Sequence, residues 1–68
     1  MQVVSIVLKC NECPAYTIST VYVGETEITA KFIEGAVATM RARYRDVLEA
    51  HTGNAELEQD ITIRVSSY

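Results

Sequence analysis

The stretch KCNECP, residues 9–14, separates two runs of the chain that are both rich in strand-forming residues. Before it, VVSIVL at residues 3–8 is an almost continuous apolar run interrupted only by Ser5, which is typical of a strand at the centre of a sheet. After it, YTISTVYV at residues 16–23 consists of the residue types that strands prefer. We therefore predict two strands joined by this short connection.

The connection itself has the composition of a turn. Asn11 and Glu12 are compatible with a turn, and Pro14 cannot donate a hydrogen bond to a strand ladder. The two strands should then form a hairpin whose tip carries Cys10 and Cys13.

A long helix is predicted after the hairpin. Thr29 is the best candidate for its N-cap, because Ile28 and Ile33 then occupy the two positions of a hydrophobic staple; Thr26 is the competing cap. Gly53 is expected to end the helix in the left-handed conformation. Residues spaced alternately by four and three form the predicted core-facing stripe: Ile33, Val37, Met40, Tyr44, Val47 and His51.

A third strand is predicted at residues 61–66, where apolar and polar residues alternate. The second strand carries the chain about 26 Å away from the hairpin tip, and a helix of about 33 Å is long enough to return it. The third strand should then run parallel to the second, with the first strand between them. The expected fold is a single α+β domain over residues 1–68, of type ββαβ, with a three-stranded sheet in the order 2-1-3 and the helix on one face.

One helix covers one face of such a sheet and leaves the other face open. Val3 and Val7 belong to this open face, together with either Val21 and Val23 or Ile18 and Tyr22, depending on the register of the hairpin. We take Val3, Val7, Val21 and Val23 as the candidate interface residues. An exposed apolar patch on so small a domain indicates a protein partner or self-association, most simply as a homodimer.

Length and composition narrow the class of protein. A chain of 68 residues buries only about 60% of the surface that its unfolded form exposes, so a metal, a disulfide or a partner chain often has to stabilise it. The net charge of −3 gives no general attraction to nucleic acid or to anionic membranes. Without a long apolar segment or a signal peptide, we expect a soluble cytoplasmic protein with no membrane partner. Its size would also suit an accessory protein of a phage or other mobile element.

The cysteine pair is a candidate metal site. Two thiolates two residues apart on a hairpin can chelate one Zn²⁺, and the returning helix should bring His51 towards Cys10 and Cys13. A fourth ligand is missing, because Asp46 points about 140° away from His51 on a regular helix; a second chain could supply its own cysteine pair instead. The alternative interpretation is that both thiols are reduced and only pack at the hairpin tip. No other cofactor is expected.

Arg41, Arg43 and Arg45 form a local basic cluster in an acidic protein. They could contact a nucleic acid or an acidic partner. The competing interpretation is a solvated helix face on which Arg45 pairs with Glu49.

No set of catalytic residues and no phosphate-binding loop is visible, so we expect no enzyme. The preferred prediction is a small binding or regulatory module that acts through protein–protein contacts and self-associates. The alternative is a zinc-stabilised nucleic-acid-binding module that uses the three arginines. A redox role for the cysteines would require a lowered thiol pKa.

Overall fold

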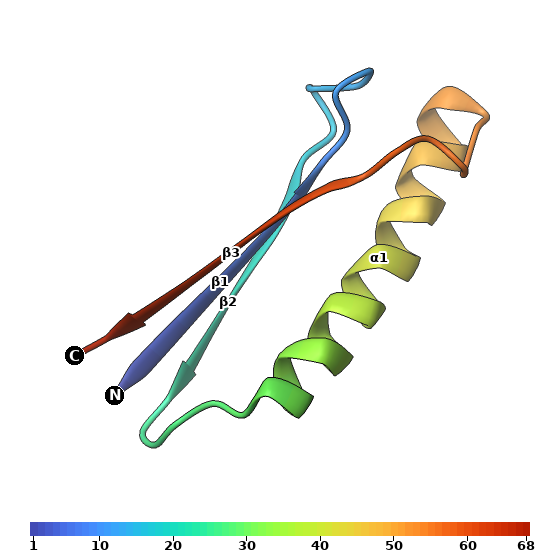
Figure 1. Ribbon diagram of the computed structural model, residues 1–68. Helices are drawn as coiled ribbons and strands as arrows, with labels where there is room; N and C mark the ends of the chain where they lie inside the picture. Colours follow the sequence, from blue (N-terminus) through green and yellow to red (C-terminus); the bar gives the residue numbers. More distant parts are fainter.

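Three strands and one helix follow one another along the chain as β1 (Gln2–Lys9), β2 (Ile18–Gly24), α1 (Ala30–Thr52) and β3 (Asp60–Ser67). The computed structural model describes all residues from 1 to 68. The strands form one sheet in the order β2-β1-β3, and α1 lies along one face of it (Figure 1). The predicted ββαβ fold and its 2-1-3 strand order are confirmed.

Both neighbours of β1 run antiparallel to it, so β2 and β3 are parallel to each other. Leu8 lies opposite Ile18 on one side and Ile61 on the other. Residues directly opposite each other point to the same face of a sheet, so these three side chains share the face that α1 covers. Val3 lies opposite Val23 on the outer face.

Both ends of α1 are capped as the sequence predicts. The Thr29 hydroxyl accepts a hydrogen bond from the Phe32 amide at 3.2 Å, which satisfies one of the free amides of the first turn. At the other end Gly53 has φ of 76° and donates its amide to the Glu49 carbonyl. A residue with a side chain would be strained in this left-handed conformation. The helix is not long and apolar enough to cross a membrane.

The core lies between α1 and β1. Its eight buried residues come from alternate positions of β1, from the hairpin tip and from one row of the helix: Val4, Ile6, Leu8, Cys10, Ala36, Met40, Tyr44 and Leu48.

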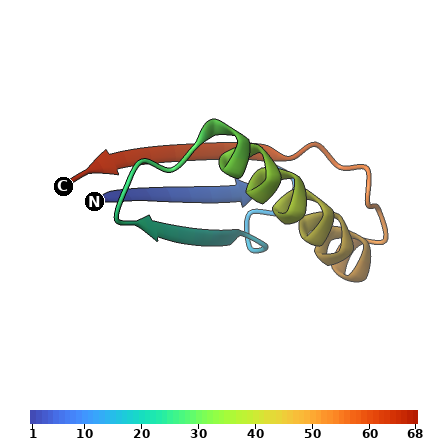
Figure 2. The same cartoon turned by 90° about the horizontal axis from the view of Figure 1, so that it is seen from below.

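The predicted helix stripe needs correction at its C-terminal end. The buried row advances by four residues at each step, so Leu48 is fully buried whereas His51 is exposed. A row of this spacing winds slowly around the helix, and it faces the sheet continuously when the helix crosses the strands obliquely. Figure 2 shows this oblique course. The predicted row, in which the spacing alternates between four and three residues, would face the sheet continuously on a helix that is aligned with the strands.

The hairpin tip is longer than predicted, because β2 begins at Ile18 and not at residue 16. Two successive turns occupy the connection: the Cys13 amide donates to the Cys10 carbonyl at 3.1 Å, and the Tyr16 amide donates to the Cys13 carbonyl at 3.0 Å. Tyr16 therefore belongs to the tip, where its backbone and ring are available to the helix.

Strand β3 is poorly covered on the side of the sheet where α1 lies. His51, at the C-terminal end of α1, stacks on the ring of Tyr16, which lies just before β2 in the chain. The two ring centroids are 4.3 Å apart. The side chains of Ile63 and Val65 point to the helix side of the sheet, yet they are 42% and 54% exposed. The sheet is thus open on its outer face and also on the β3 side of its inner face.

Candidate interaction site

Strand β3 is the part of the sheet with the least cover. All of its residues from Thr62 to Ser67 are exposed, whereas exposed residues in β2 alternate with partly buried ones. The alternation in β2 reflects one open and one covered face. In β3 both faces are open, so this strand presents Ile63 and Val65 on one face and Arg64 on the other.

The outer face carries the four valines predicted as interface residues. The strand register brings Val3, Val7, Val21 and Val23 to this face together. Val21 and Val23 are 58% and 64% exposed, and Val3 and Val7 on the central strand are half-buried by their neighbours. The structure therefore settles which alternate residues of β2 share the face with Val3. Their contact with a partner stays a prediction.

The hairpin tip is held against the helix by Tyr44. This tyrosine is fully buried in the core, and its hydroxyl donates a hydrogen bond to the Tyr16 carbonyl. The expected return of the helix to the hairpin tip is therefore observed. The residue that makes the buried contact is Tyr44, one helical turn before Leu48, while the exposed His51 stacks on the ring of Tyr16.

The environment of the tip raises the pKa values of two groups. The pKa of the Cys13 thiol lies above its usual value of 9.0, because of desolvation and because of the neighbouring Cys10 thiol and the Glu12 carboxylate. The pKa of the Tyr44 hydroxyl is raised above 10.0, by desolvation first and then by the thiols of Cys10 and Cys13. A redox-active cysteine pair needs a lowered pKa, so this environment does not favour the redox alternative.

The candidate zinc ligands do not form a cluster. No group of three or more His, Cys, Asp or Glu side chains is arranged to hold a metal ion. Cys10 is 1% exposed and packs in the core, whereas Cys13 is partly exposed, and His51 and Asp46 are exposed on α1. Zinc binding stays a prediction. Its test is the metal content per chain by native mass spectrometry, with Cys10→Ser as the control.

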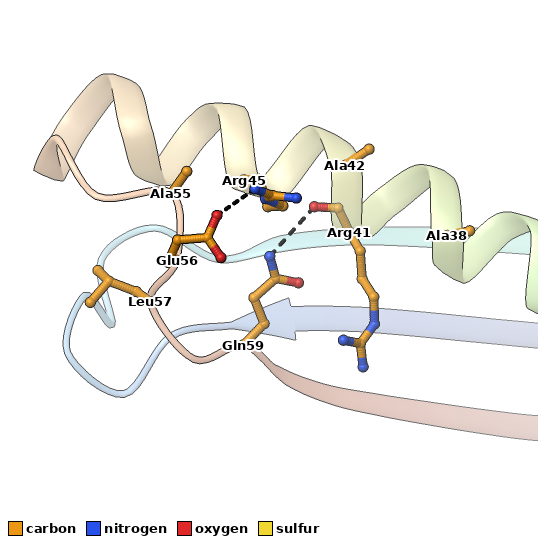
Figure 3. A pocket seen from close by; sticks show the side chains of 8 residues that line it. All are labelled: Ala38, Arg41, Ala42, Arg45, Ala55, Glu56, Leu57 and Gln59. Carbon is orange, nitrogen blue, oxygen red and sulfur yellow. Dashed lines mark hydrogen bonds and ion pairs between the residues drawn. The ribbon is translucent and has the colours of Figure 1, made fainter.

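The three arginines of the helix do not form one patch. Arg41 and Arg45 line a shallow hollow of about 470 Å³ between α1 and the segment that leads into β3, whereas Arg43 lies about 200° around the helix from Arg41. Arg45 forms an ion pair with Glu56 at 2.5 Å. Figure 3 shows this pair and the Arg41 side chain, which extends down from the helix. The predicted pairing of Arg45 with Glu49 is replaced by this longer-range ion pair.

Two features of the site were absent from the sequence prediction. Ile63 and Val65 alternate with polar residues, which indicates a half-buried strand, but both are exposed in the structure. Gln2 was also missed: its side-chain oxygen accepts a hydrogen bond from the Ile28 amide at 2.8 Å and so holds the segment before α1 against β1. The sequence signal for this role was that Gln2 is a polar residue at the start of an apolar strand.

Comparison with protein-family models, with curated proteins and with solved structures finds no match for this chain.

Proposed function

We propose that this protein is a non-enzymatic interaction module that acts through protein–protein contacts and self-associates. The observation that carries the proposal is the exposure of β3 on both faces, with Ile63 and Val65 on the side of the sheet that the helix should cover. Removal of these exposed apolar side chains from water by a partner would be favourable.

The size of the core supports the same proposal. Only 8 of the 68 residues are buried, in a thin molecule measuring 40 × 19 × 14 Å, so the single chain removes little apolar surface from water. Domains of this size commonly gain stability from a further chain, a metal or disulfides. Cys10 and Cys13 form no disulfide, and the exposed apolar surface of β3 favours a further chain as the source of this stability.

Sedimentation velocity over a wide concentration range tests self-association directly. We expect a species of twice the 7.6 kDa chain mass to accumulate as the concentration rises. A mass of one chain at every concentration up to about 1 mM would contradict the proposal. Dye binding provides a second measurement, because a monomer with open β3 should bind a dye for apolar surfaces more strongly than the associated form.

The alternative function, a zinc-stabilised nucleic-acid-binding module, stays a prediction. Arg41 and Arg43 have no acidic partner within the chain, which leaves their charge available to a phosphate. Binding of this kind should weaken as salt rises and should be reduced in a triple alanine variant of Arg41, Arg43 and Arg45. Absence of binding at low salt would remove this alternative.

A further inference from the structure

We infer that two copies of this chain associate through the free edge of β3, pairing antiparallel about a two-fold axis at Ile63 to form one six-stranded sheet. The inference rests on the self-association proposed above and names its contact surface. The two faces of β3 and its free backbone groups form this surface, which is called the β3 edge below.

The hydrogen bonds at the chain ends show which backbone groups are free. The Tyr68 amide donates to the Met1 carbonyl at 2.8 Å, and the Met1 amino group donates to the Tyr68 carbonyl at 3.0 Å. These two residues are therefore a hydrogen-bonded pair in the register of β1 and β3. Such pairs alternate along an antiparallel ladder, so the even-numbered residues of β3 point their amides and carbonyls at β1.

The odd-numbered residues of β3 consequently point their amides and carbonyls away from the sheet. They are Ile61, Ile63, Val65 and Ser67. An edge with regularly spaced free donors and acceptors, no proline and a single inward-facing apolar row is a template for another strand.

Strand β2 also has a free edge, formed by the backbone groups of Ser19, Val21 and Val23. The inner face of β2 is already covered: Tyr22 packs edge-to-face against Phe32 of α1, with ring centroids 5.1 Å apart. A strand added beside β2 would therefore gain little inner-face burial. A strand added beside β3 would also cover Ile63 and Val65, so association through the β3 edge buries more apolar surface.

A second copy is the partner that fits the β3 edge. Although the chain has a net charge of −3, residues 60–67 contain one acid, Asp60, and one base, Arg64. With Ile63 on the two-fold axis, Arg64 lies opposite Thr62 of the second copy and diagonal to its Asp60, at about 7 to 8 Å between backbones, which an arginine side chain can span. The same contact occurs twice by symmetry.

The neighbouring register is less favourable. Moving the axis to Arg64 would place the two copies of this arginine directly opposite each other on the outer face, and like charges in that position destabilise strand pairing. Moving it to Val65 would shorten the paired segment, because β3 ends at Ser67. Ile63 at the axis pairs seven residues of each copy, from Asp60 to Ser66.

Amide hydrogen exchange measured by NMR on the associated protein tests the contact surface. We expect the amides of Ile63 and Val65 to exchange at least about tenfold more slowly than those of Val21 and Val23, which face the free edge of β2. All four residues lie in well-formed strands of the same molecule, so the β2 amides serve as an internal control.

A matched pair of substitutions provides a second test of the β3 edge as the contact surface. Ile63→Lys places like charges opposite each other at the axis and should raise the dimer dissociation constant at least about tenfold. Val21→Lys introduces the same charge at another exposed strand position and should change this constant less than about threefold. Circular dichroism checks that both variants fold. If Ile63→Lys does not fold, the amide exchange pattern of the unsubstituted protein decides whether the β3 edge is the contact.

The outcomes separate this inference from the proposed function. A protein that remains monomeric at every concentration overturns both. A dimer in which Ile63 and Val65 exchange as fast as Val21 and Val23, or in which Val21→Lys weakens association more than Ile63→Lys, keeps the proposed self-association and overturns the β3 edge as its surface.

Discussion

At the scale of single residues, Tyr44 connects α1 to the hairpin tip across the core. It is the largest fully buried side chain, it comes from the middle of the helix, and its hydroxyl donates to the Tyr16 carbonyl in the tip. The thiols of Cys10 and Cys13 lie close enough to raise its pKa. The cysteine turn is thus positioned by packing and by one side-chain hydrogen bond.

Tyr44→Phe should lower the free energy of unfolding by about 1 to 1.5 kcal/mol, because the Tyr16 carbonyl loses its donor while the ring remains. Urea unfolding at neutral pH measures the change. Tyr22→Phe is the control: this ring packs against Phe32 at the sheet edge, and its loss of a hydroxyl should cost less than about 0.5 kcal/mol. Equal effects of the two substitutions would mean that the Tyr44 hydrogen bond contributes nothing.

The raised pKa values of Cys13 and Tyr44 predict how stability depends on pH. The folded protein favours the protonated form of both groups more than the unfolded chain does, so their contribution is complete below about pH 9. The free energy of unfolding should then fall as the pH rises through 9 and 10, and Tyr44→Phe should remove part of that fall. Urea midpoints at a series of pH values provide the test, and midpoints that rise across this range would contradict it.

At the scale of elements, Gly24 at the end of β2 and Gly35 inside α1 differ in how much room they leave for a side chain. A Cβ atom added at Gly24 would lie 2.9 Å from Cγ1 of Ile28 and 3.1 Å from the Thr26 carbonyl oxygen. One added at Gly35, on the exposed side of α1, would meet nothing within 4 Å. The first glycine is required by packing, and the second only lowers helix propensity.

Gly24→Ala should therefore destabilise the protein by about 1 to 2 kcal/mol, since the loop must shift to accept the methyl group. Gly35→Ala should stabilise it by about 0.5 to 1 kcal/mol through the better helix propensity of alanine. Thermal unfolding of the two variants measures both signs in one experiment. A stabilising Gly24→Ala would show that this loop is not tightly packed.

Most of the architecture was predictable from local sequence. Three features depend on neighbouring residues alone: the cap at Thr29, the stop at Gly53 and the apolar character of β1. Together with the lengths of the elements and their order in the chain, these features determine the strand order. The crossing angle of α1 depends on how side chains of distant elements interlock. For that reason the burial of Leu48 in place of His51, and the exposure of Ile63, were not predictable.

At the scale of the whole molecule, the sheet has several uncovered edges and faces that association with a second chain would cover. Both outer strands have free edges, the outer face carries four valines, and the helix leaves the inner face of β3 open. Pairing through the β3 edge would remove one free edge from each copy and place both outer valine patches on one continuous face. The strand pattern and the single helix predicted the exposed valine face, but the second exposed surface at β3 required the structure.

The dependence of the melting temperature on chain concentration tests most directly the central claim that a second copy completes this fold. Unfolding of a self-associated protein releases two chains, so the melting temperature should rise steadily when the concentration increases about a hundredfold. In the same series, the melting temperature of Ile63→Lys should rise less with concentration if the β3 edge is the contact. A melting temperature of the unsubstituted protein that is independent of concentration would show that the single chain is the complete folded unit.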